Sequence, residues 1–292
     1  MIAFNTISDL VRLADEKAVL IHDIVLAKEQ HDAQRPRTAL LADMARNWEV
    51  MKASVQRGIE NEAHSASGLT GGDAEKLYAH RTEGYLGEIA LRTAAYAVGV
   101  SEVNATMGRI VACPTAGSCG IMPAVLCAAQ EQRGYADDAI VLALFTAAGI
   151  GMVIDQNASI AGAEGGCQAE CGTAAGMAAA ALVELAGGTP QDIANACALA
   201  IKNLLGLACD PVAGLVEVPC VKRNGFCAVH ATLAADMTLA GIRSVIPCDD
   251  VIAAMDAIGR SMPAAIRETA EGGLAATERG RALAAQIYPK HS

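Results

Sequence analysis

The amino-acid sequence predicts an all-α protein, built as a single compact helical domain, and two observations support that class. Hydrophobic residues make up 53% of the 292-residue chain and aromatic residues only 3%, so Ala, Leu, Val, Ile and Met must build the core. Helices rich in Ala approach one another closely, which favours a tight helical bundle. No repeat, linker or low-complexity tract divides the sequence, so we expect one domain over residues 1–292.

The first 62 residues show the spacing of two amphipathic helices. We expect an opening helix of about two dozen residues with Thr6 or Ser8 as its N-cap, ended by the polar residues 31–37 around Pro36. A second helix is predicted over residues 38–62, because apolar side chains recur there at intervals of three and four: Leu41, Met44, Trp48, Met51, Val55 and Ile59. These two helices should form an outer layer, which is either a solvated face or a partner-binding face.

The remaining helices are predicted from apolar runs and from helix start and stop signals. The run 139–154 is uncharged but too short to span a bilayer, so it should be a buried helix that begins at Asp137 or Asp138. Thr189, Pro190 and Asp192 form a complete helix start, with an N-cap, Pro at the first position and a carboxylate at the third. The expected helices cover residues 85–110, 121–133, 137–154, 172–186, 189–205, 225–245, 249–262 and 277–288.

Charge and cysteine content restrict the class of protein. The net charge of −10 and the lack of a basic patch argue against a nucleic-acid partner. The N-terminus is charged and amphipathic and does not resemble a signal peptide, so we expect a cytoplasmic protein without a membrane anchor. In that compartment ten cysteines serve metal binding or packing rather than disulfides.

Two glycine-rich loops with cysteines, residues 161–172 and 206–220, bracket an Ala-rich region. Three of the cysteines, Cys167, Cys209 and Cys220, follow the pattern C-x41-C-x10-C. That spacing is too wide for a zinc knuckle, whose ligands come in close pairs. A larger group held by thiolates from separate loops, such as an iron–sulfur cluster, accounts for it. The alternative is three small buried hydrophobic residues, since free cysteine is among the most buried residue types.

Polar residues near glycines mark further candidate sites. Thr70, Gly71 and Gly72 would place a hydroxyl beside exposed backbone N–H groups, an arrangement that suits a carboxylate, although an ordinary turn has the same sequence. Thr115 and Ser118 stand where a helix beginning near residue 121 offers free amides, and a structural N-cap is the alternative there.

Two more candidates stand close to the cysteine loops. Asn157 follows the most apolar predicted helix, where the chain enters the loop that carries Cys167. Lys202 lies four residues before Gly206, near the loop that carries Cys209. The alternative for Lys202 is a last-turn cation that complements the helix dipole.

Several long stretches resemble one family. They are CPTAGSCGIMPAVL (113–126), GGCQAECGTAAGMAAAALVELAGGTP (165–190), NLLGLACDPVAGLVEVPCVKRN (203–224), SGLTGGDAEKLY (67–78) and AGIRSVIPCDDVIAAM (240–255). The chain is similar to the alpha chain of bacterial iron–sulfur-dependent L-serine dehydratase. The resemblance implies an all-helical catalytic domain and a [4Fe–4S] cluster held by Cys167, Cys209 and Cys220, with Cys171 outside the ligand set.

The resemblance also implies an activity, the deamination of L-serine to pyruvate and ammonia without pyridoxal phosphate. An iron without a protein thiolate would act as a Lewis acid on the serine hydroxyl. The expected substrate-binding residues are Thr70, Gly71, Gly72, Thr115, Ser118 and Asn157. The base is left open between Lys202, Ser118 and a group from another chain.

Single-chain members of this family carry an extra regulatory domain and end in a cysteine, whereas this sequence ends in Ser292. We therefore expect a separate beta chain and a hetero-oligomer. Two alternatives stay open: a related lyase acting on cysteine or threonine, and a non-catalytic iron–sulfur or zinc-binding module.

Overall fold

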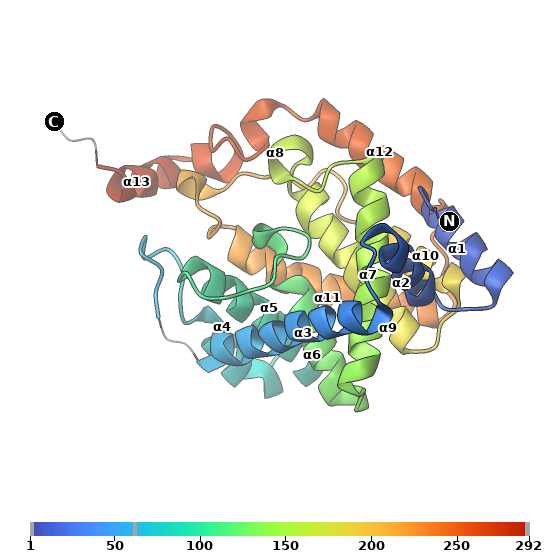
Figure 1. Cartoon of the computed structure of the whole chain (residues 1–292). Coiled ribbons are helices and arrows are strands. Elements are labelled where there is room, and N and C mark those ends of the chain that lie inside the picture. Colours follow the sequence, from blue (N-terminus) through green and yellow to red (C-terminus); the bar gives the residue numbers. More distant parts are fainter. Residues whose placement is uncertain (1–2, 61–62, 290–292) are drawn as a thin grey trace.

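The computed structural model describes residues 3–60 and 63–289, and these residues form thirteen α-helices without a β-strand (Figure 1). The predicted all-α class is confirmed. The helices are α1 (Ile7–Lys17), α2 (Ile21–Asp32), α3 (Arg37–Glu60), α4 (Asp73–Ala79), α5 (Glu88–Ala105), α6 (Ile121–Arg133), α7 (Asp137–Asn157), α8 (Gly162–Gly165), α9 (Thr173–Leu185), α10 (Pro190–Lys202), α11 (Cys220–Leu239), α12 (Cys248–Ser261) and α13 (Glu278–Ile287).

Helix α9 lies at the centre of the bundle, packed against α6, α7, α10 and α11. Its run of alanines, residues 178–181, is fully buried. The small side chains let neighbouring helices approach closely. At Gly176 an added Cβ would lie 3.0 Å from Cys197 Sγ on α10, so this contact depends on the absence of a side chain.

The N-terminal layer corrects one prediction, because the expected single opening helix is two helices. Ala18 adopts a left-handed conformation (φ 52°), and the amides of Ala18 and Val19 close α1 by donating to carbonyls of its last turn. The apolar spacing continues across this break, so the sequence pattern does not show it. Thr6 is the N-cap, and the Ser8 hydroxyl instead donates to Asp249 Oδ2 at 2.6 Å.

The second amphipathic helix is confirmed as α3, with Trp48 fully buried. Its described part ends at Glu60, and the predicted end at residue 62 lies outside the described residues. The Trp48 indole donates to Asp137 Oδ1 at 2.7 Å. This bond joins the long outer helix α3 to the start of the buried helix α7 (Figure 1).

Helix α7 is the one helix in the described part of the chain that is long and apolar enough to cross a membrane by length and composition. It packs against α2, α3 and α9, and most of its apolar window is buried in the protein. These contacts are those of a core helix, as expected. Its N-cap is Ala136 rather than Asp137 or Asp138.

The cysteine-bearing segments are more regular than predicted. Residues 161–172, expected as a loop, contain α8 and a π-helical turn over Gln168–Gly172 that leads into α9. Helix α11 begins at Cys220, five residues before the expected start. The start of α10 is as predicted: Thr189 Oγ1 accepts from Asp192 N at 3.2 Å, and Asp192 Oδ2 accepts from Thr189 N at 3.0 Å.

Candidate functional site

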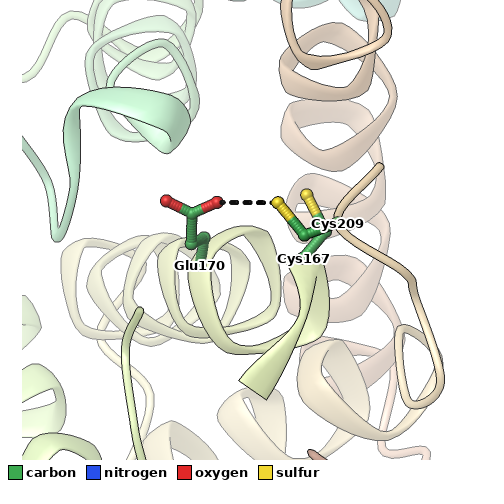
Figure 2. Close-up of side chains that lie close together, drawn as sticks. All are labelled: Cys167, Glu170 and Cys209. Carbon is green, nitrogen blue, oxygen red and sulfur yellow. Dashed lines mark hydrogen bonds between the residues drawn. The ribbon is translucent and has the colours of Figure 1, made fainter. Parts of the chain in front are cut away.

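Two of the three predicted cysteine ligands meet a carboxylate in the interior. The ligand atoms of Cys167, Glu170 and Cys209 all lie within 4.8 Å of one another, and all three residues are buried. Cys209 Sγ lies 3.9 Å from Glu170 Oε2, and Cys167 Sγ lies 3.9 Å from Cys171 Sγ. Figure 2 shows the Glu170 carboxylate pointing toward the sulfurs from the helical turn that follows Cys167. We call Cys167, Glu170 and Cys209 the thiolate–carboxylate group.

The backbone around Cys167 and Cys209 is fixed by hydrogen bonds between distant segments. Cys209 N donates to Ile266 O at 2.9 Å, and Glu268 N donates to Cys209 O at 2.7 Å, a short parallel pairing with residues 266–268. The Gln168 side chain accepts from Gly206 N at 2.9 Å and donates to Met255 O at 2.8 Å. Both cysteine-bearing segments are therefore held in place by the protein itself.

Cys220, the third predicted ligand, is buried at the first position of α11 and lies outside the 4.8 Å group. Burial raises the pKa of its thiol to about 12, and the negative charges of Cys167 and Glu170 add to that effect. Cys220 therefore shares the electrostatic environment of the group. An iron–sulfur cluster is larger than a single ion, so its ligands need not lie within one ion's coordination sphere.

Cys167 is the thiolate of the site. Hydrogen bonds from the thiols of Cys171 and Cys209, followed by the charge of Arg223, hold its pKa well below the usual range. The same contact with Cys167, together with burial, raises the pKa of Cys209, which stays protonated beside it. Burial raises the pKa of Glu170 to about 7. These shifts favour the thiolate at Cys167, with the neighbouring thiols as hydrogen-bond donors.

Glycines let the backbone pack closely against the thiolate–carboxylate group. A Cβ on Gly162 would lie 2.8 Å from Glu170 Oε2 and 2.9 Å from Cys209 Sγ, and one on Gly117 would lie 3.0 Å from Glu170 Oε1. Thiolates are the ligands that iron–sulfur clusters prefer. The donor set, and glycines where any side chain would reach the group, fit such a cluster.

Sequence reasoning missed Glu170 and Arg223. Glu170 stands three residues after Cys167 in an otherwise apolar segment, and Arg223 stands three residues after Cys220. The Arg223 guanidinium donates to Ala208 O at 2.8 Å and to Asp210 Oδ1 at 2.9 Å, which anchors the loop that carries Cys209. The signal in the sequence that could have indicated both residues is a charged residue one helical turn after a cysteine.

The neighbours of Arg223 anchor two other loops. Lys222 Nζ lies 2.5 Å from Asp73 Oδ2, which ties the glycine-rich loop at residues 67–73 to α11. Asn224 Nδ2 donates to Gly117 O at 2.8 Å, and Asn224 Oδ1 accepts from Gly120 N at 2.9 Å. Three consecutive residues of α11 therefore position three loops that are far apart in the sequence.

The loop with Thr70 already binds a carboxylate of the protein. Glu102 accepts from the amides of Asp73 and Ala74 at 2.9 and 3.2 Å, and the Thr70 hydroxyl donates to Glu102 at 3.5 Å. Gly71 and Gly72 have positive φ values of 143° and 71°, so this turn requires glycine. The amides at the start of α4 therefore hold Glu102.

Thr115 is part of the site, and Ser118 lies directly behind it. The Thr115 hydroxyl donates to Glu170 Oε1 at 2.8 Å. Ser118 is fully buried with its hydroxyl 3.2 Å from Thr115 Oγ1, and the two form a capping box around a short 3₁₀ turn. Thr115 and Ser118 therefore have the capping role that was the alternative in the sequence analysis, and Thr115 also contacts the site.

Asn157 and Lys202 have partners elsewhere. Asn157 Nδ2 donates to Asn5 O at 2.7 Å and to Val153 O at 2.8 Å. Lys202 Nζ donates to Ser244 O at 2.7 Å, in the loop between α11 and α12. These contacts hold the N-terminal segment and that loop, respectively.

The fold and the site together define an all-helical protein with a buried thiolate–carboxylate site assembled from distant segments. The model of the family described as "Serine dehydratase alpha chain" matches residues 16–275. The chain belongs to this family.

Curated relatives extend the match over nearly the whole chain. The "Probable L-serine dehydratase, alpha chain" of Bacillus subtilis (strain 168) is 51% identical over 287 residues, which cover 98% of this chain and 95% of that protein. The "L-serine dehydratase, alpha chain" of Peptoniphilus asaccharolyticus is 41% identical, with 96% of each chain covered. "L-serine dehydratase TdcG" of Escherichia coli (strain K12) is 37% identical over 93% of this chain but only 61% of its own length.

Proposed function

We propose that this chain catalyses the deamination of L-serine to pyruvate and ammonia, using a [4Fe–4S] cluster held by Cys167, Cys209 and Cys220. Relatives named L-serine dehydratase support the reaction. The observation that carries the proposal is the buried thiolate–carboxylate group, which contains two of the three proposed cysteine ligands. One catalytic domain over residues 1–292 is part of this proposal.

The reaction removes a proton from Cα of serine and hydroxide from Cβ, after which the enamine tautomerises and water releases ammonia. When bound, the cluster supplies Lewis acidity that makes the hydroxyl a better leaving group. The surrounding residues are buried and exclude bulk water, which strengthens polar contacts to the substrate. We propose that the hydroxyls of Thr115 and Ser118 orient serine and relay the Cα proton, with Glu170, which accepts from Thr115, as the carboxylate that would take it up.

We propose that the glycine-rich loop with Thr70, Gly71 and Gly72 borders the substrate carboxylate, next to the amides of Asp73 and Ala74 that hold Glu102. Its connection to the cysteine loop supports this placement, because Glu217, three residues before Cys220, accepts from the hydroxyls of Ser65 and Ser67 at 2.6 and 2.8 Å. Asn157 and Lys202 stay predictions from the sequence, and we leave both out of the mechanism because their contacts lie elsewhere.

A separate beta chain is the proposed partner, in a cytoplasmic hetero-oligomer. The alpha-chain names of two relatives support it, as does the chain's coverage of only 61% of the Escherichia coli protein. Neither nucleic acid nor a membrane is part of the proposal, in keeping with the net charge of −10.

One observation favours a second candidate, a mononuclear metal site. Three ligand atoms within 4.8 Å of one another match the number of protein ligands in many zinc sites. Such a chain would bind zinc through Cys167, Glu170 and Cys209 and would not need Cys220.

Anaerobic purification followed by metal, sulfide and activity analysis separates the two candidates. We expect a brown protein that forms pyruvate from L-serine, and we expect Cys167→Ser, Cys209→Ser and Cys220→Ser each to abolish iron retention and activity together. Cys127→Ser is the control, because Cys127 packs in the core on α6. Zinc in place of iron, or normal iron in the Cys220 variant, would contradict the cluster assignment. A panel with L-cysteine and L-threonine tests the substrate.

A further inference from the structure

The connection between α11 and α12 exposes apolar side chains that contact little of the protein. Val245 is 89% exposed and Ile246 51% exposed, and Leu239 and Ile242 are each about half exposed. These four residues lie within eight positions of the sequence, and we call them the apolar loop surface. Single exposed hydrophobic residues are ordinary, but a group of large ones marks an interaction site.

The backbone at Val245 has an unfavourable conformation. Its φ is 68°, in the left-handed region. A β-branched residue there is a genuine outlier, because its side chain crowds the following carbonyl. Asn or Gly would fit this position better, and Val245, with 89% of its surface exposed, gains little from burial to offset the strain.

Buried polar contacts hold this loop rigidly from behind. Ser244 N donates to Asn195 Oδ1 at 2.7 Å, and Lys202 Nζ donates to Ser244 O at 2.7 Å. Asn195 Nδ2 also donates to Ile242 O at 2.9 Å. The strained backbone is therefore fixed in one position, and the apolar side chains are presented on a preorganised support.

A groove of about 560 Å³ lies beside the loop, between α1 and α10, and Val245 and Ile246 line it. The arginines at this groove are already paired with acidic residues, Arg12 with Glu16 at 3.0 Å and Arg243 with Asp192 at 2.5 Å. No excess of positive charge is available there for a phosphate backbone or an anionic lipid surface. The chemistry suits an apolar face of another polypeptide.

We propose that the apolar loop surface and its groove are the docking site for the beta chain, a proposal that rests on the proposed function for the existence of that partner. The chain covers 95% of the Bacillus subtilis alpha chain but only 61% of the Escherichia coli protein, which carries a further region in the same polypeptide. A catalytic fold that works beside that region must offer it a contact surface. The apolar loop surface supplies such a contact surface, because its strained backbone is held in place and its apolar side chains are exposed for burial by a partner.

The test measures binding of the full-length chain to the separately purified beta chain encoded by the same genome, by anaerobic titration calorimetry. Val245→Asn removes the apolar side chain and suits the left-handed backbone. We expect it to raise the melting temperature of the isolated chain by about 2 °C while it weakens beta-chain binding at least tenfold. Ile246→Asp should weaken binding by more. Tyr85→Asp, at a fully exposed aromatic residue on the loop before α5, is the control and should bind normally.

Iron content and sedimentation of each variant complete the experiment. Iron per chain should stay at the wild-type level, because neither substituted residue belongs to the thiolate–carboxylate group or is a proposed ligand. Unchanged beta-chain affinity in both loop variants would overturn the docking site. Variants that lose self-association but still bind the beta chain would also overturn it, because the surface would then be a contact between copies of this chain. An iron-free wild-type chain that still bound the beta chain through Val245 would contradict the proposed function and leave the docking site supported.

Discussion

Replacing Arg223 with Met tests whether the start of α11 holds the Cys209 loop in place. The guanidinium donates to Ala208 O and forms an ion pair with Asp210, on either side of Cys209. Both charged side chains are largely buried, with 17% and 7% of their surfaces exposed. Met keeps the aliphatic stem of the side chain and removes only the charge and its hydrogen bonds.

The expected loss of stability follows from what Asp210 retains. Removing one partner of a buried ion pair costs about 3–5 kcal/mol, because the other charge is left in the interior. Asp210 Oδ2 still accepts from Leu274 N at 2.7 Å. We therefore expect Arg223→Met to lower the free energy of unfolding by about 3 kcal/mol, the lower end of that range. The chain should remain folded at 25 °C, since domains have about 5–15 kcal/mol of stability.

Urea unfolding of the metal-free protein, followed by far-UV circular dichroism, measures this loss, and iron retention after reconstitution measures its effect on the site. The double variant with Asp210→Asn should be more stable than Arg223→Met alone, because no buried charge is then unpaired. Arg12→Met is the control, since that arginine is half exposed and solvent screens its ion pairs. Equal stability of the Arg223 and Arg12 variants, or a double variant that costs the sum of its singles, would refute the reasoning.

Three further predictions concern the site, Lys202 and the outer helices. Gly162→Ala should cost about 1–3 kcal/mol and lower iron retention, because the new Cβ would lie 2.8 Å from Glu170 Oε2. Gly172→Ala, with its nearest atoms at 3.9 Å, should retain iron normally. Equal iron in both variants would contradict the need for glycine at position 162. Lys202→Met should keep wild-type serine turnover, since the Lys202 ammonium donates to the backbone carbonyl of Ser244. A fall in kcat of about 100-fold would instead indicate that Lys202 is the catalytic base. Hydrogen bonds from Gln130, and then from Trp48 and Lys52, lower the pKa of Asp137 from 3.8 to about 2. The stability that these bonds add is therefore complete above pH ~4 and is lost as the pH falls toward ~2. Asp137→Asn should remove this pH dependence of the unfolding free energy, measured by urea titrations followed by Trp48 fluorescence.

The fold class and most helices were predictable from local signals. Thr189 and Pro190 mark the start of α10 because capping chemistry depends on adjacent residues. The break at Ala18 was not predictable, because the apolar spacing continues across it and the left-handed residue is not a glycine. The early start of α11 at Cys220 was missed for a similar reason, since a Pro-rich loop leads into it without a recognisable side-chain cap.

The site was predictable only where family motifs or cysteine positions indicated it. Nothing local to Glu170 shows that it meets Cys209, because that contact depends on how α9 and residues 206–209 pack. Thr70 shows the opposite case. Its sequence predicts a substrate carboxylate site, and in the structure the Thr70 hydroxyl contacts the carboxylate of Glu102, a residue 32 positions away. Local chemistry specifies what a loop can bind, and tertiary packing decides what it does bind.

Helix α11 connects the proposed cluster ligand Cys220 to the proposed docking site for the beta chain. Cys220, the third proposed ligand, begins this helix, and Leu239 ends it at the apolar loop surface. Twenty helical residues span about 30 Å, and α11 packs against α5, α9 and α10 along that length. Because the first turn of α11 holds three separate loops, a beta chain that shifted the helix from its far end would move all three together. The same helix therefore carries the proposed ligand Cys220, the anchors of three loops and, at Leu239, one residue of the proposed docking site.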